Sequence, residues 1–185
     1  MTSTRYTGVA ITLHWLMALM ILGSIAVGLY MVELDLSPQK LKLYSWHKWA
    51  GVTIFWLACI RVLWRLAHPA PPLPENLPRW QHGVAHATHL AIYVLLFAIP
   101  LSGWLMSSAF GFQVVYLGVL PIPDLLAKNK ELAEQLKELH EILNMALWVL
   151  LLLHAGAALK HHVIDRDSVL HRMLPVLKNP TGVKQ

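Results

Sequence analysis

The sequence predicts an all-α integral membrane protein, a four-helix bundle, and two observations lead to this fold class. Of the 185 residues, 56% are hydrophobic and only 14% are charged, a balance more apolar than that of ordinary soluble domains. Four segments are also apolar over the roughly 20 residues that a helix needs to cross a hydrocarbon core of about 30 Å. These predicted spans cover residues 8–32, 43–66, 82–107 and 139–162.

Each predicted span has a feature that bears on its structure. The first is too long for the apolar core of a signal peptide, so we expect it to remain as a helix. The second ends in arginines. Pro100 lies inside the third and predicts a kink, with the freed carbonyl satisfied inside the bundle. Before the fourth, residues 124–139 have helical apolar spacing, which predicts an outer-face helix that runs into this span.

The distribution of charge predicts the orientation. Most of the 15 lysine and arginine residues fall on the side of the two chain ends, so the positive-inside rule places both termini in the cytoplasm. The net charge of +5 then suits contact with anionic lipid, and nothing in the sequence resembles a nucleic-acid module. The single cysteine, Cys59, lies within a span, so disulfides play no part.

Two histidines of the fourth span indicate the chemistry. His140 and His154 are fourteen residues apart, so in a helix they share a face and lie roughly 21 Å apart along the axis. His47 opens the second span at the depth of His140, and His14 lies early in the first span at the depth of His154. We therefore expect two bis-histidine haem sites, which pair His14 with His154 and His47 with His140.

Further residues share these faces. Gly28 is fourteen residues after His14, and Gly51 is one turn after His47, so either glycine could make room for a porphyrin edge, although ordinary helix packing explains them too. Arg61 is fourteen residues after His47, where it could pair with a haem propionate or extend to the headgroups.

Three more histidines leave alternatives open. His86 and His89 of the third span are one turn apart on the cytoplasmic side. Either could replace His14 as a ligand, but a supporting hydrogen-bonding role is favoured. His161 follows His154 by seven residues on the same face, where it could contact a quinone carbonyl or have no role beyond the interface.

The chain resembles the prokaryotic cytochrome b561 family from about residue 6 to residue 175. The resemblance rests on the segments AITLHWL, YSWHKWAG, IRVLWRL, HGVAHATHLAIYVLLFAIPLSGWLM and HEILNMALWVLLLLHAGAALKHHVIDRDSVLHRMLP. It implies a four-helix dihaem cytochrome b domain over 1–175, a cytoplasmic tail over 176–185 and a bacterial inner (cytoplasmic) membrane location. It also implies two haem b groups, with the same four ligands as the depth argument, and ubiquinone as electron acceptor near His161.

Within that family the chain is most similar to the single-subunit superoxide oxidases. This similarity implies a superoxide:ubiquinone oxidoreductase that takes electrons from superoxide at the outer face. Lys40, Lys42 and Lys48 near His47 could steer the anion, or could simply be solvated. The alternative is an electron-transfer subunit or relay that connects a partner dehydrogenase or a soluble donor with the quinone pool.

Overall fold

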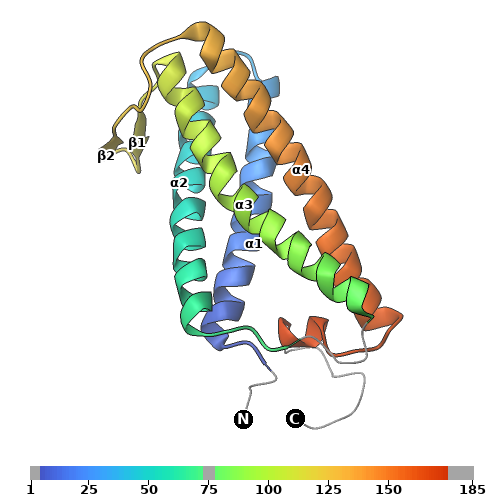
Figure 1. Ribbon diagram of the computed structural model, residues 1–185. Helices are drawn as coiled ribbons and strands as arrows, with labels where there is room; N and C mark the ends of the chain where they lie inside the picture. Colours follow the sequence, from blue (N-terminus) through green and yellow to red (C-terminus); the bar gives the residue numbers. More distant parts are fainter. Residues whose placement is uncertain (1–4, 73–77, 175–185) are drawn as a thin grey trace.

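The computed structural model describes residues 5–72 and 78–174 and contains four long helices (Figure 1). They are α1 (Gly8–Glu33), α2 (Pro38–Ala67), α3 (Arg79–Phe110) and α4 (Lys130–Val163). Each is long and apolar enough to cross a membrane, and each contains one of the four predicted spans. The protein is an integral membrane four-helix bundle, as predicted.

Side chains at the helix ends explain where the helices begin. Thr7, Ser37 and Asn129 precede α1, α2 and α4, and the side-chain oxygen of each accepts a hydrogen bond from the backbone N–H three residues later. These bonds satisfy donors that the first turn leaves without partners. Pro38 occupies the first turn of α2, where a missing N–H costs nothing.

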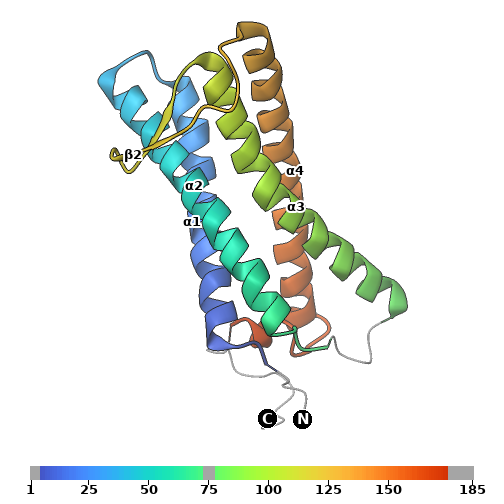
Figure 2. The ribbon, with the colours of Figure 1, turned by 60° about the vertical axis from the view of Figure 1, so that its left-hand side comes forward.

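The helices pack as two pairs. α1 packs against α2, α3 packs against α4, and a contact between α2 and α3 joins the two pairs, whereas neither α1 nor α2 makes an extensive contact with α4. Figure 2 shows the two pairs side by side. The terminal end of the bundle is the end where α1 begins and α4 finishes, and the hairpin end is the opposite one, where α3 leads to a small β-hairpin.

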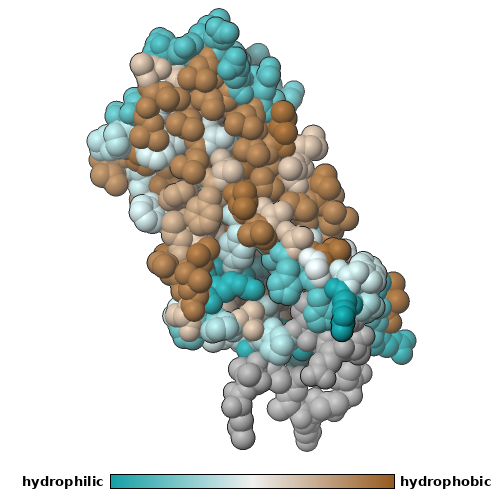
Figure 3. All heavy atoms as spheres, in the orientation of Figure 1, coloured by the Kyte–Doolittle hydropathy of each residue, from teal (hydrophilic) through white to brown (hydrophobic). Residues whose placement is uncertain are grey.

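A layer of buried side chains fills the middle of the bundle between the two ends. Ile21, Ile54 and Leu147 are buried and belong to one apolar cluster with residues of α3. Each lies seven residues from one of the predicted haem-ligand histidines, which places the layer about 10 Å from each site along the axis. Figure 3 shows apolar side chains over the middle of the bundle and hydrophilic ones gathered at the hairpin end.

The sequence did not predict the link between α3 and α4. The chain forms strands β1 (Val114–Tyr116) and β2 (Leu120–Ile122), paired antiparallel. The hairpin is fixed to α2, because Trp49 donates its indole N–H to the Val115 carbonyl at 2.7 Å and Thr53 shares a 2.9 Å hydrogen bond with the Tyr116 hydroxyl.

The helix expected from residue 124 begins only at Lys130. Residues 124–129 follow Pro123 and have no helical structure, because Asn129 is the capping residue that starts α4. From Lys130 the helix is continuous with the fourth span, so the expected run into that span is present and only its start was wrong.

After α4 the chain returns across the terminal end. A short 3₁₀ helix, η1 (Leu170–Arg172), packs against α4. Trp15 of α1 donates its indole N–H to the Met173 carbonyl at 2.8 Å, and Arg172 donates to the carbonyl of Pro72. This segment therefore reaches α1 at Trp15, the residue after His14. The predicted tail, residues 176–185, lies outside the described residues.

We predict that Gly111→Ala lowers the stability of the protein. Gly111 ends α3 with φ +77°, and a Cβ there would lie 3.2 Å from the Lys128 side chain. A non-glycine residue in this conformation costs about 1–2 kcal/mol, so the midpoint of thermal unfolding in detergent, followed by circular dichroism, should fall. Gly83→Ala is the control, since its Cβ would meet nothing within 4 Å. Equal midpoints for both variants would contradict the prediction.

Candidate functional site

Two pairs of histidines face each other across the bundle. In the hairpin pair, the rings of His47 from α2 and His140 from α4 have centroids 6.3 Å apart and planes at 82°. In the terminal pair, the rings of His14 from α1 and His154 from α4 have centroids 6.1 Å apart and planes at 67°. The structure therefore brings together the same two pairs that the depth of the histidines predicted.

The separation of the rings fits an iron between them. A metal bound by two opposed imidazoles, about 2 Å from each nitrogen, holds the ring centroids about 6 Å apart. Both pairs have this spacing. Each pair also joins α4 to a helix with which it makes no extensive contact, so a flat group between the rings does not have to displace a packed helix interface.

Hydrogen bonds set the tautomer of both rings in the hairpin pair. His47 Nδ1 lies 3.0 Å from the carbonyl of Ser24 and 3.2 Å from the Ser24 hydroxyl. His140 Nδ1 lies 3.1 Å from the carbonyl of Ile99 and 2.9 Å from the Ser102 hydroxyl. Because a carbonyl can only accept, each Nδ1 carries the proton, and each Nε2 is left with a lone pair for a metal.

Two glycines make these hydrogen bonds possible. A Cβ on Gly28 would lie 3.2 Å from His47 Cε1, and a Cβ on Gly103 would lie 3.2 Å from His140 Cε1. In the structure Gly28 contacts the ring of His47. The role of Gly28 beside a porphyrin edge stays a prediction. Gly51 differs, because an added Cβ would meet nothing within 4 Å, which leaves the open space that a porphyrin edge needs.

The hairpin pair is reached from the surface. A hollow of about 240 Å³ between α1 and α2 borders His47, with Gly23, Ser24 and Trp46 in its wall. The ring of His47 therefore borders open space on the side of the bundle.

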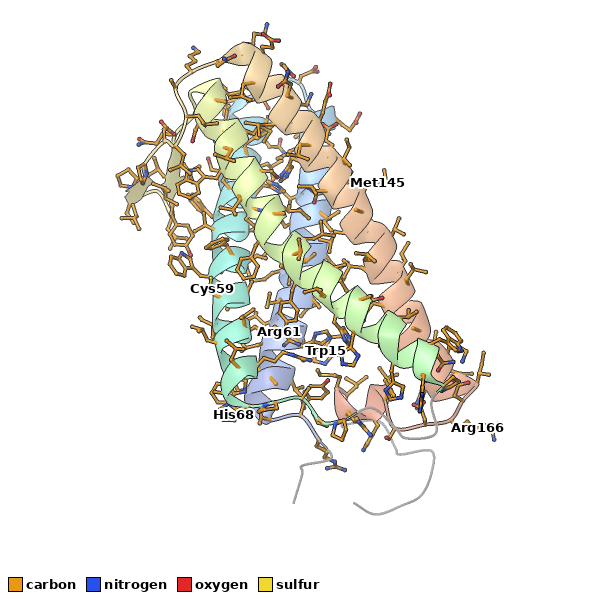
Figure 4. The ribbon with its side chains drawn as sticks, viewed as in Figure 1. Trp15, Cys59, Arg61, His68, Met145 and Arg166 are labelled. Carbon is orange, nitrogen blue, oxygen red and sulfur yellow. The ribbon has the colours of Figure 1, made fainter. Side chains whose placement is uncertain are left out.

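Arg61 points into the bundle at the terminal end. Its guanidinium donates to the Ala10 carbonyl at 2.8 Å and to the Tyr93 hydroxyl at 3.1 Å, and its Nη2 lies 3.5 Å from His14 Nδ1. Figure 4 shows Arg61 and Trp15 at the same level of the bundle. The cation is therefore held beside the terminal pair and is not extended toward the headgroups.

The structure separates His86 from His89. His86 is exposed, and its Nδ1 donates to the His82 carbonyl of its own helix at 2.7 Å. The ring of His89 faces His154 with the centroids 5.4 Å apart. That distance is shorter than an iron between two opposed rings allows, so the geometry favours His14 as the partner of His154 and His89 as a neighbour of the site.

His161 heads a polar cluster just beyond the terminal pair. Its Nδ1 lies 2.7 Å from Asp167 Oδ2 and 3.1 Å from Asp165 Oδ2, and Asp167 is only 8% exposed. The hydrogen bond from Lys160 lowers the pKa of Asp165, which keeps this carboxylate charged. The ligand atoms of the three residues could meet at a metal ion, but the Lys160 ammonium, 2.6 Å from Asp165, already neutralises one carboxylate.

The three lysines near His47 contact neighbouring groups. Lys40 donates to the Leu34 carbonyl at 2.5 Å, so it caps the end of α1. Lys48 donates to the Phe112 carbonyl at 3.2 Å. The ammonium of Lys42 lies 4.9 Å from the centre of the Trp46 ring. Their charges are therefore held at the hairpin end, where a steering role requires them.

Sequence reasoning missed several residues of these sites. They are Ser24, Tyr93, Ile99, Ser102, Gly103 and Asp167. One signal was available: Ser24 and Gly28 are four residues apart, as are Ile99 and Gly103, and a glycine four residues after a carbonyl exposes that carbonyl in a helix. The contacts of Tyr93 and Asp167 are not visible from spacing.

A four-helix membrane bundle with two facing histidine pairs at two depths has the architecture of a membrane-bound b-type cytochrome. The sequence profile described as prokaryotic cytochrome b561 matches residues 5–176, and the chain belongs to this family. It is thus a multi-pass membrane cytochrome of the electron-transfer kind, with b-type haem as its cofactor.

Relatives match over nearly their full length. "Cytochrome b561 homolog 2" of Escherichia coli (strain K12) is 39% identical over 184 residues, 98% of this chain and 97% of that protein. "Probable superoxide oxidase CybB" of Yersinia pestis is 30% identical over 176 residues, 92% of this chain and 96% of that protein. "Cytochrome b561 homolog 1" of E. coli (strain K12) is 29% identical over 176 residues, 92% of this chain and 97% of that protein.

We predict that the two pairs can be emptied one at a time. His47→Ala and His140→Ala should each remove one haem, and His14→Ala and His154→Ala should each remove the other, because each pair lies at its own level. The ratio of haem to protein and the low-temperature absorption spectrum measure this. His86→Ala is the control and should keep both haems. If His89→Ala loses a haem and His14→Ala does not, the terminal pair is wrongly assigned.

Proposed function

We propose that the chain is a superoxide:quinone oxidoreductase with two haem b groups. Superoxide gives up one electron at the hairpin end and leaves as oxygen. Two such events, together with two protons taken up at the terminal end, reduce one ubiquinone to ubiquinol. The relative named as a probable superoxide oxidase, 30% identical to the chain, supports this donor.

The observation that carries the proposal is the presence of one facing histidine pair at each end of the bundle. Bound between the rings of each pair, a b-type haem supplies a one-electron carrier with no open coordination position. Arg61 and Gly51 serve this group in the proposal. Arg61 supplies a cation for a propionate at the terminal end, and Gly51 leaves room for a porphyrin edge at the hairpin end.

The hairpin end suits a small anionic donor. Lys40, Lys42 and Lys48 hold three positive charges on the first turns of α2, just before and after His47. Positive charge beside an access path raises the local concentration of an anion and the rate of its encounter. In this proposal the hollow that borders His47 serves as the access path.

The terminal end suits quinone reduction, because it can deliver protons. The bond from His161 Nδ1 to the buried Asp167 carboxylate leaves Nε2 as the position that meets a quinone oxygen. When His161 is protonated, Nε2–H donates to that oxygen, and Asp167 stabilises the imidazolium. Asp167 itself is held by the backbone N–H of Val169 at 2.9 Å, so the dyad keeps its orientation as the proton moves.

We place the protein in the bacterial inner membrane with both termini in the cytoplasm and the hairpin end outside. The excess of lysine and arginine on the terminal side supports this orientation. We assign residues 1–175 to one dihaem cytochrome domain. The fold-back through η1 supports this boundary, because it ties residues as late as Met173 to α1.

The test uses the purified single chain in detergent with an enzymatic source of superoxide. We expect superoxide to reduce the haems, which is followed by their absorbance. Added ubiquinone should reoxidise the haems, with one quinol formed per two superoxide ions. The His47→Ala and His154→Ala variants should lose quinone reduction, since each lacks one of the two carriers. If superoxide reduces neither haem in the wild-type chain, the donor assignment fails and the chain is a relay for a partner dehydrogenase.

We predict that the lysines act on the rate of encounter. Changing Lys40, Lys42 and Lys48 together to Gln keeps hydrogen-bond donors at these positions but removes three charges. The second-order rate of haem reduction by superoxide should fall several-fold at low ionic strength, and the difference should shrink as salt screens the field. Lys137→Gln is the control, an exposed lysine on α4. An unchanged rate at low salt would exclude steering by these lysines.

A further inference from the structure

The two histidine pairs have different electrostatic surroundings. In the hairpin pair, both Nδ1–H groups donate to a backbone carbonyl and lie beside a serine hydroxyl. In the terminal pair, His14 Nδ1 lies 3.5 Å from the guanidinium of Arg61, and within the described chain His154 has no hydrogen-bond partner. One pair thus faces electron-rich acceptors and the other faces a cation.

The hairpin pair is held by the same device on two helices. In an α-helix the carbonyl of residue i points toward residue i+4. Where that residue is glycine, no Cβ shields the carbonyl from a neighbouring helix. Ser24 with Gly28 on α1 exposes an acceptor to His47, and Ile99 with Gly103 on α3 exposes one to His140. A carbonyl has two lone pairs, so the Ser24 carbonyl can accept this bond in addition to its helical one. At Ile99 the second lone pair faces both His140 and the Ser102 hydroxyl.

Ser102 completes the arrangement around His140. Its hydroxyl donates to the Ile99 carbonyl at 2.8 Å, so its oxygen is free to accept from His140 Nδ1 at 2.9 Å. The Nδ1–H proton is therefore shared between two acceptors. Ser102 is 4% exposed, so water does not compete for either bond.

We propose that Ser24, Gly28, Ser102 and Gly103 are positioning residues that hold the reduction potential of the hairpin haem below that of the terminal haem. The proposal rests on the function proposed above, in which each pair binds a haem. An acceptor on Nδ1–H makes the imidazole a more basic ligand, which favours ferric iron. The cation beside His14 disfavours the extra positive charge of the ferric state. Electrons then run downhill from the hairpin end toward the quinone end.

The first test measures both potentials without turnover. Redox titration of His154→Ala reports the haem at the hairpin pair, and titration of His47→Ala reports the haem at the terminal pair. We expect the lower midpoint potential in His154→Ala. Arg61→Gln, made in the His47→Ala background, should lower the potential of the terminal haem, because it removes the cation. The opposite order of potentials would overturn the proposal, whether or not superoxide is the donor.

The second test changes the two proposed positioning residues of α3, Ser102 and Gly103. Ser102→Ala and Gly103→Ala should each raise the potential of the hairpin haem and shift its electron paramagnetic resonance g-values. The first removes an acceptor, and the second places a Cβ 3.2 Å from the ring. The terminal haem, present in the same sample, should not change and so reports intact folding.

Matched variants separate this effect from a general disturbance of the helix. Ser102→Thr keeps the hydroxyl and should restore the wild-type potential. Ser108→Ala removes a buried hydroxyl that bonds to Trp104, and Gly83→Ala adds a Cβ in open space, so both should leave the two potentials unchanged. If Ser102→Ala and Gly103→Ala shift neither the potential nor the g-values, these residues only fill space and the proposal is wrong.

Discussion

A polar nitrogen inside a membrane needs a partner, because an unsatisfied polar group in hydrocarbon costs several kcal/mol. This constraint arranges the helices around His47 and His140. α1 lies where the Ser24 carbonyl can meet His47, and α3 lies where the Ile99 carbonyl can meet His140. Each of these helices therefore supports a ring that belongs to its neighbour, and the pairing of α1 with α2 and of α3 with α4 follows from it.

The apolar layer between the two sites separates two ends of the bundle that differ in their polar side chains. Ile21, Ile54 and Leu147 pack there with residues of α3. The levels above and below this layer differ in their polar groups. The hairpin end has lysines and a surface hollow, and the terminal end has Arg61 and the His161–Asp167 dyad. A donor and an acceptor of different chemistry can thus be served by one small bundle.

Periodicity within single helices made the bundle and the histidine pairs predictable. The interval of fourteen residues between His140 and His154 places both on one face of α4 at two depths, independently of the neighbouring helices. The depths of His14 and His47 then match them to these two positions. Contacts between helices were not predictable in this way. Spacing left Gly28 with two roles, a porphyrin edge or ordinary helix packing, and did not show its contact with His47. The hairpin on α2 and the return of the chain to Trp15 depend on tertiary hydrogen bonds that no local pattern records.

The position of α4 in the chain has a consequence for biogenesis. Both pairs draw one histidine from α4, which is the last long helix of the described chain. During synthesis α1, α2 and α3 enter the membrane first, so until α4 follows, each site has only one imidazole from its pair. A group that binds between the rings of either pair can then not be held from both sides while the protein is incomplete. Both sites therefore become complete only after α4 has entered the membrane.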